Sequence, residues 1–234
     1  MAELRWPCRY QSPRARAAQA ARGGAPATRL RINASVSFGA QRLVPVITEY
    51  LERFPEVEID LVLNDRFVDL VEEGFDAIFR IGVPSETNLI AHELAPFRVT
   101  ACAAPDYLRR RRIPSTPTDL ADHECVGYTQ WPDPNVYVWR FIRDGRIVEA
   151  QVRSRLRVNN AAALLQAALA GFGIVFIAED LARDALRDGT LVRVLPNYDS
   201  PTRPVHLLRH PDRRPTPKLR AFIDIVTEQL GPSS

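Results

Sequence analysis

The sequence predicts an α/β protein of two lobes, each a mostly parallel sheet flanked by helices, hinged by two crossing strands. Three observations support this fold class. Strand and helix patterns alternate over residues 29–82 with short connectors, which requires parallel strands with helices packed outside them. Two extended segments then meet near Pro96, where the alternation changes. A closing strand and helix at about residues 203–230 are expected to return to the first lobe, so that the chain crosses between the lobes twice.

The first lobe is predicted over residues 29–99 together with residues 203–230. Its clearest element is an amphipathic helix whose apolar residues recur with helical spacing, namely Leu43, Val44, Ile47, Tyr50, Leu51 and Phe54. Pro55 ends this helix, and the alternation of apolar and acidic residues over 57–63 predicts a half-buried strand. The other predicted elements are strands at 29–35, 76–81 and 205–209, a short helix at 67–74, and a last helix that begins at Thr216-Pro217.

The second lobe is predicted over residues 100–202. An extended segment at 98–104 leads into it, and Thr116-Pro117 offers a capping hydroxyl followed by proline at the first helical position. The other predicted elements are strands at 124–128, 138–141, 146–152, 154–158, 174–177 and 191–195, and helices at 160–170 and 179–187. Residues 1–28 carry no clear periodicity and are predicted to be a tail or the remnant of a linker.

The charge distribution argues against a nucleic-acid-binding surface on the globular part. The chain has 31 lysines and arginines, 28 acidic residues and a net charge of +3. Seven of the arginines fall within residues 1–31, which contain one acidic residue, so the remainder of the chain is slightly acidic. A nucleic-acid footprint needs clustered positive charge, and only the N-terminal tail has a surplus.

Cysteine usage and hydropathy predict a cytoplasmic protein with no membrane partner. Cys8, Cys102 and Cys125 are scattered and odd in number, so neither a disulfide framework nor a thiolate zinc site is expected. The N-terminus lacks the apolar region of a secretory signal. The apolar stretch at 161–178 is split by two glycines into a helix-like half and a strand-like half, so it is not predicted to span a membrane.

No catalytic constellation is recognisable in the sequence. The chain lacks a Gly-x-Ser-x-Gly elbow, a Walker A loop and a Gly-x-Gly-x-x-Gly motif, and its four histidines do not have the spacing of metal ligands. The run of four arginines at 109–112 is interpreted as a solvated helix end rather than an anion-binding patch. The sequence therefore predicts no catalytic residue, no metal site and no cofactor, and a protein that is not an enzyme.

Three polar spots lie at the carboxyl ends of predicted parallel strands, where ligands bind in open α/β sheets. The first is the strand-to-helix turn at 35–39, whose hydroxyls and free N–H groups suit an anion; a plain N-cap at Ser37 is equally favoured. The second is Arg80, for which an ion pair with a neighbouring acid such as Asp65 or Asp76 is slightly favoured over ligand binding.

The third spot, Asn159-Asn160, opens the predicted helix of the second lobe, where capping alone is at least as well supported as ligand binding. Thr100, at the proposed crossing, would lie on the floor of a cleft between the lobes. Two helix N-termini facing each other across that cleft would favour a small carboxylate or a similarly polar effector. A preference for neutral ligands would overturn this hypothesis.

The same residues carry a resemblance to a known family. Residues 30–39 (LRINASVSFG) and 70–82 (LVEEGFDAIFRIG) resemble the effector-binding domain of LysR-type transcriptional regulators. Shorter similar segments are FPEV at 54–57, APDYL at 104–108, WRF at 139–141, VNN at 158–160 and AGFGI at 170–174. As a set, the matches cover roughly residues 29–230.

The resemblance implies a fold like that of periplasmic binding proteins and a metabolite in the cleft that alters how a homodimer or tetramer holds DNA. Carried over by position, the cleft residues are Ser35, Ser37, Phe38, Arg80, Thr100, Asn159 and Asn160. Family members begin with a winged helix-turn-helix and a long linker helix, for which too few residues precede the domain here. DNA binding is therefore expected only through a helix-turn-helix absent from this chain.

Other interpretations are open. A solute-binding protein of a transporter would share the fold, although the sequence has no signal peptide and no lipobox cysteine. An enzyme on this fold would need a paired acid and base, which the sequence does not offer. A shortened regulator could also act through mixed dimers with a full-length homologue.

Overall fold

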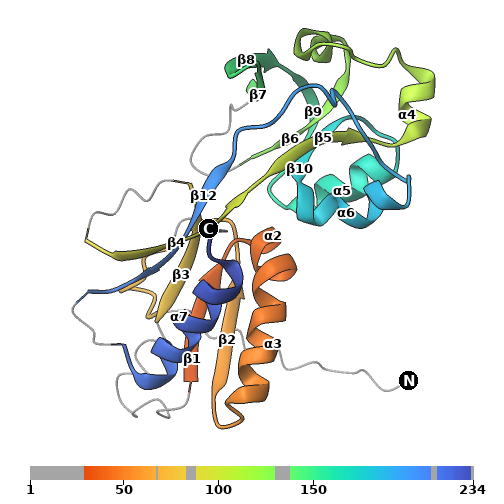
Figure 1. Cartoon of the computed structure of the whole chain (residues 1–234). Helices are drawn as coiled ribbons and strands as arrows, with labels where there is room; N and C mark the ends of the chain where they lie inside the picture. Colours follow the sequence, from red (N-terminus) through yellow and green to blue (C-terminus); the bar gives the residue numbers. More distant parts are fainter. Residues whose placement is uncertain (1–28, 67, 83–87, 130–137, 212–214, 233–234) are drawn as a thin grey trace, which may run out of the picture.

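A computed structural model of the chain describes residues 29–66, 68–82, 88–129, 138–211 and 215–232. Figure 1 shows two lobes, one above the other, joined where β4 (Ile90–Phe97) leads into β5 (Val99–Ala103) and where the chain returns to β12 (Arg203–Arg209). The predicted tail at 1–28 lies outside the described residues. The two-lobed α/β architecture predicted from the sequence is confirmed.

The lower lobe of Figure 1 is built on a five-stranded sheet in the order β2-β1-β3-β12-β4. Its other strands are β1 (Arg29–Ala34), β2 (Glu58–Leu63) and β3 (Ala77–Ile81). β1 pairs in parallel with β2 and β3, whereas β12 runs antiparallel to both β3 and β4. The direction of β12 follows from its origin, because it enters from the upper lobe whereas β1, β2 and β3 end towards that lobe.

Two helical segments cover this sheet. α2 (Val36–Phe38), a π-helical turn (Gly39–Leu43) and α3 (Val44–Arg53) follow one another without a break, and α7 (Pro217–Leu230) packs beside α3. Between them, Tyr50 and Phe222 meet edge to face with ring centroids 5.3 Å apart, and Phe222 meets Phe79 of β3 at 6.5 Å. The last helix of the chain thereby completes the core of the lobe in which the described chain begins.

The upper lobe contains a mixed sheet where the sequence predicts a mostly parallel one. β10 (Val175–Ala178) and β11 (Val192–Arg193) both run antiparallel to β5. β6 (Glu124–Tyr128) and β9 (Arg153–Val158) pair in parallel, and a parallel bridge between Cys125 and Ile174 joins them to the β10 side. The sheet is mixed because β5 enters from the lower lobe and runs away from it, opposite to both of its neighbours.

The remaining elements of the upper lobe surround this sheet. They are α4 (Pro105–Arg110), a 3-10 helix (Pro117–Asp122), the hairpin of β7 (Val138–Arg143) and β8 (Arg146–Gln151), α5 (Ala161–Leu169) and α6 (Glu179–Arg187). Trp139 and Phe141 of the hairpin each lie 5.3 Å from the ring of Phe176 on β10. These aromatic contacts fix the hairpin on the core of the lobe.

The two segments that cross between the lobes are tied to each other. On the returning segment, the Val194 N–H donates to the Ala101 carbonyl at 2.9 Å, and the Ser200 hydroxyl donates to the Val99 carbonyl. Paired crossings of this kind form a hinge about which two lobes can rotate. The lobes are therefore positioned to open or close around whatever lies between them.

Two predicted elements differ in the structure. Residues 70–74 form a turn instead of the predicted short helix, because the Asp69 side chain satisfies the next free N–H groups and Gly74, at φ 69°, reverses the chain. Its predicted first residue, Phe67, lies outside the described residues. The predicted strand at 191–195 is reduced to β11, because Leu195 adopts a left-handed φ of 58°.

We expect the buried His123 to make the folded protein less stable in mild acid. His123, just before β6, is 7 % exposed, and the Tyr107 hydroxyl lies 3.1 Å from its Nδ1. Burial lowers the pKa of His123, with Arg111 nearby acting in the same direction. The unfolded chain therefore binds more protons than the folded chain below about pH 6.5, and stability falls as the pH drops through that value.

Thermal unfolding of the wild type and of His123→Asn between pH 7.5 and 5 checks this expectation. The variant should lose less stability on acidification than the wild type. It should still lose some, because burial also lowers the pKa of His92 in the other lobe. An identical pH dependence of the two proteins would contradict the assignment to His123.

Candidate functional site

The two lobes face each other across the carboxyl ends of parallel strands. β1, β2 and β3 of the first lobe end towards the second lobe. β6 and β9 of the second lobe, which run parallel to the β10 side, end towards the first. Helices α2 and α5 start at these strand ends and contact each other across the gap between the two lobes. This facing arrangement is where ligands bind in two-lobed α/β proteins.

The first predicted spot combines one core residue with two polar ones. Phe38 is 2 % exposed and packs against Phe79 with ring centroids 5.6 Å apart, so it supports the turn from below rather than facing the gap. Ser35 occupies the N-cap position of α2, and its Oγ is buried without a hydrogen-bond partner among the described residues. Ser37, the predicted N-cap, lies half-buried within α2, and the N-cap is Ser35 instead.

The second predicted spot is held by an asparagine that the sequence analysis did not single out. Arg80 Nη1 donates to Asn33 Oδ1 at 2.9 Å, and Arg80 Nη2 donates to the Val68 carbonyl at 3.4 Å. Asn33 is completely buried, and its amide N–H donates to the Val62 carbonyl at 2.9 Å. This network fixes the guanidinium at the end of β3.

The third predicted spot shows the capping geometry. Asn160 is the N-cap of α5, and its Oδ1 accepts hydrogen bonds from the N–H groups of Ala162 at 2.9 Å and Ala163 at 3.2 Å. Asn159 is exposed beside it. The amide oxygen of Asn160 is thus already committed to the helix, whereas Asn159 lies open to solvent at the edge of the gap.

Asp65 connects the two lobes, although the sequence analysis weighed it only as a partner for Arg80. One carboxylate oxygen accepts from the Val36 N–H at 3.0 Å, and the other accepts from the Tyr128 hydroxyl at 2.7 Å. Val36 begins α2 in the first lobe, and Tyr128 ends β6 in the second. Burial, and then the hydrogen bond to Asp65, raise the pKa of Tyr128, so its hydroxyl stays protonated at neutral pH.

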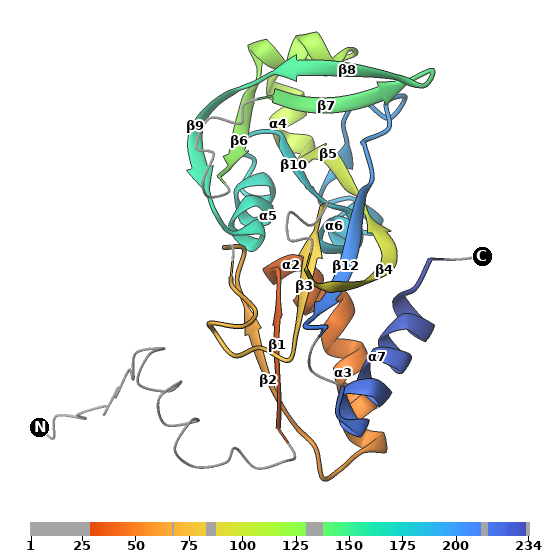
Figure 2. The same ribbon diagram turned by 90° about the vertical axis from the view of Figure 1, so that its left-hand side faces the viewer.

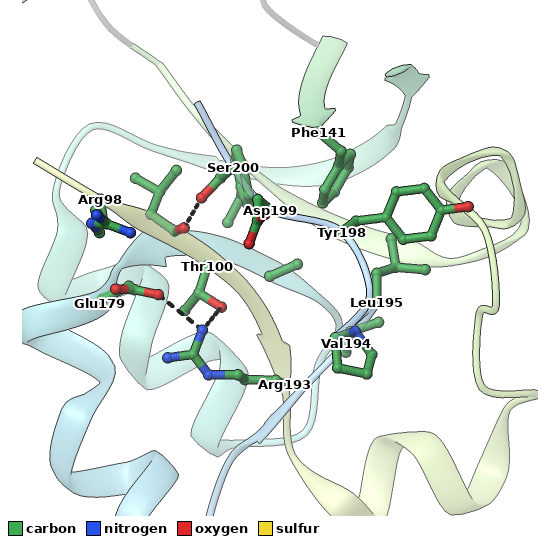
Figure 3. Close-up of a pocket in the computed structure, with 14 residues that line it drawn as sticks. Arg98, Thr100, Phe141, Glu179, Arg193, Val194, Leu195, Tyr198, Asp199 and Ser200 are labelled. Carbon is green, nitrogen blue, oxygen red and sulfur yellow. Dashed lines mark hydrogen bonds and ion pairs between the residues drawn. The ribbon is translucent and has the colours of Figure 1, made fainter. Parts of the chain in front are cut away.

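A pocket of about 90 Å³, which we call the crossing pocket, lies between the two crossing segments and opens to solvent (Figure 3). It is lined by the start of β5, by Phe141 and by the return segment at 194–200, and it shares Thr100 with the predicted site. Thr100 is 7 % exposed, and its hydroxyl accepts from Arg193 Nη1 at 3.2 Å. Arg193 also pairs with Glu179 at 2.8 Å. The other predicted residues do not line this pocket.

The described part of the chain contains no group of three or more His, Cys, Asp or Glu side chains placed to hold a metal ion. Cys102 and Cys125 are buried thiols, and burial raises the pKa of each to about 12. Cys8 lies outside the described residues. Within the described ranges, no helix is both long enough and apolar enough to cross a membrane.

Comparisons with known proteins agree with this architecture. The family described as LysR substrate binding domain matches residues 23–231. The transcriptional regulator PtxR of Pseudomonas aeruginosa is 34% identical over 209 residues, which are 89% of this chain and 66% of that protein. The uncharacterized regulator YhjC of Escherichia coli K12 is 33% identical over 186 residues, which are 80% of this chain and 62% of that protein. The chain therefore spans slightly less than two thirds of the length of these curated relatives.

Solved structures show the same fold. The regulatory domain of CrgA, a LysR-type transcriptional regulator from Neisseria meningitidis, superimposes with a TM-score of 0.78 at 25% identity, covering 88% of this chain and 100% of that one. Full-length AphB, a virulence activator from Vibrio cholerae, gives 0.75 at 28% identity, covering 86% of this chain and 68% of that one. These matches confirm the family and fold predicted from the sequence. The chain therefore belongs to the LysR substrate binding domain family, the effector-binding regulatory domains of LysR-type transcriptional regulators.

Proposed function

We propose that the chain binds a small polar effector between its lobes, and that this binding changes how a longer regulator acts on transcription. The observation that carries the proposal is a pair of buried polar atoms at the carboxyl ends of β1 and β2. Ser35 Oγ and Asn64 Oδ1 have no hydrogen-bond partner among the described residues. Buried polar atoms are almost always paired, so a ligand or water between the lobes is the natural partner for these two.

The geometry bears on the chemical class of this effector. The N–H groups that open α2 and α5 are already engaged by the side chains of Asp65 and Asn160. The two helix N-termini, which suggested a carboxylate from the sequence, are therefore partly satisfied from within the chain. We therefore propose a polar ligand, either neutral or anionic. Its proposed contacts are Ser35, Ser37, Arg80, Thr100, Asn159 and Asn160, with Phe38 as packing support.

The assembly in which the domain acts is also part of the proposal. We place the lobe boundaries at 29–99 with 203–230 and at 100–202, and the protein in the cytoplasm as a homodimer or tetramer. DNA would be contacted through a helix-turn-helix of the longer regulator. The family match argues against a transporter solute-binding protein, which is the alternative with the same fold.

A thermal-shift screen of the purified chain against small polar metabolites, acids and neutral analogues alike, tests the proposal. A ligand at about 100 times its dissociation constant should stabilise the fold by about 2.7 kcal/mol. The shift should be lost in Ser37→Ala or Arg80→Ala. A matched control is Ser200→Ala, which removes a hydroxyl from the crossing pocket instead. A shift that survives in Ser37→Ala and Arg80→Ala but disappears in Ser200→Ala would contradict the interlobe site.

A further inference from the structure

We propose that Asp65 and Tyr128 form a clasp that holds the two lobes closed before any ligand binds. The inference rests on the proposed function in one respect, namely that the gap closed by the clasp is the effector site. It concerns the regulation of that site, because a chain that closes on its own must reopen to admit an effector. The clasp itself can be tested without an effector.

The contacts of Asp65 reach both lobes from a single side chain. Its carboxylate accepts from the Val36 N–H of the first lobe at 3.0 Å and from the Tyr128 hydroxyl of the second at 2.7 Å. Both hydrogen bonds involve a carboxylate, and Tyr128 is only partly exposed, so they are stronger than a solvent-exposed neutral pair. The Tyr128 hydroxyl is the only part of this arrangement that belongs to the second lobe.

The clasp lies away from the hinge. In Figure 2, α5 and the upper end of β2 are on the side opposite β12 and α6. On the hinge side, Arg42 of the first lobe pairs with Asp180 of α6 at 2.5 Å. The start of α6 also packs there, because Ala178 and Leu181 join the core of the first lobe. This side acts as a pivot, so the clasp restrains rotation at the far edge.

In the closed arrangement, two polar atoms beside the gap lack hydrogen-bond partners within the described part of the chain. Ser35 Oγ and Asn64 Oδ1 are buried without partners among the described residues. Under our proposal, opening exposes both atoms to water. An unpaired buried polar atom disfavours the closed state, whereas the clasp favours it. Because the two contributions oppose each other, losing the clasp should shift the balance of open and closed forms measurably.

The experiment measures the distance between the lobes by pulsed electron spin resonance in the ligand-free chain. Spin labels are placed on cysteines at two exposed positions, Val71→Cys in the first lobe and Ile147→Cys in the second, with Cys8→Ser to remove the tail thiol. The buried Cys102 and Cys125 are poor labelling sites. We expect one distance population in this background. Tyr128→Phe should raise the proportion of a second, more open population by about tenfold, equivalent to about 1.4 kcal/mol.

Two further variants separate a clasp from a general contribution to stability. Asp65→Asn should open the lobes in the same direction as Tyr128→Phe, because it removes the charge from the same contact. Tyr107→Phe is the matched control: this tyrosine is also buried, but its hydroxyl contacts His123 and Glu124 of its own lobe. It should lower the melting temperature and leave the interlobe distance unchanged.

Either of two results would overturn the clasp. The first is a distance distribution in Tyr128→Phe and Asp65→Asn that equals that of the labelled background. The second is an equal opening in Tyr107→Phe, which would indicate general loosening. Neither result bears on the effector screen, so failure of the clasp and failure of the proposed function are distinguishable.

Discussion

Phe222→Ala is expected to lower the free energy of unfolding by about 3–5 kcal/mol. Phe222 is completely buried on α7, and its ring contacts Tyr50 of α3 and Phe79 of β3. Truncation would remove contacts from both neighbours and leave a cavity between the helices and the sheet. Chemical denaturation of the variant and the wild type measures this loss.

The matched control for this substitution is Phe172→Ala in the second lobe. Phe172 is only partly buried, and its ring lies beneath Arg155 at 5.9 Å. Its truncation should cost clearly less than that of Phe222. Equal losses in the two variants would contradict the claim that the C-terminal helix, about 170 residues after Tyr50 in the chain, closes the core of the first lobe.

Asn33→Leu is the second substitution with a large expected effect, a loss of about 2–4 kcal/mol. The completely buried amide donates to the Val62 carbonyl and accepts from Arg80 Nη1, both at 2.9 Å. Leucine has a similar volume but makes neither hydrogen bond. The guanidinium of Arg80 would lose a buried partner, which costs more than losing a neutral hydrogen bond.

Asn160→Ala provides the comparison, because it removes another amide, one that caps a helix, at a cost of about 1 kcal/mol. Equilibrium denaturation should rank Asn33→Leu as the more destabilising of the two. The variant should also weaken binding of any effector that depends on Arg80. Stability equal to or above that of Asn160→Ala would show that the Asn33 network does not hold Arg80 in place.

Periodicity predicts the elements that have one dominant packing face. The helix α3, which ends at Arg53, and the alternating strand before Asn64 are recognisable because one face of each is apolar. The turn at 70–74 was less predictable, since two apolar residues followed by Gly74 suit a helix as well as a turn. The choice depends on Asp69, whose side chain satisfies the free N–H groups at once.

The candidate site was predictable in position but not in its internal pairing. Strand ends and helix starts indicate where polar residues gather, and the family resemblance adds the candidates themselves. The partners of those residues come from distant parts of the chain. Asn33 meets Arg80 across 47 positions, and Asp65 meets Tyr128 across 63. No local pattern encodes such contacts, because they exist only after the strands pair and the lobes meet.

Amide NMR of the isotope-labelled chain, during titration with a ligand found by thermal shift, shows whether the effector binds between the lobes. We expect chemical-shift changes that centre on Ser37, Arg80 and Asn160, with smaller changes at the hinge. Changes confined to Arg193, Ser200 and their neighbours in the crossing pocket would contradict binding between the lobes.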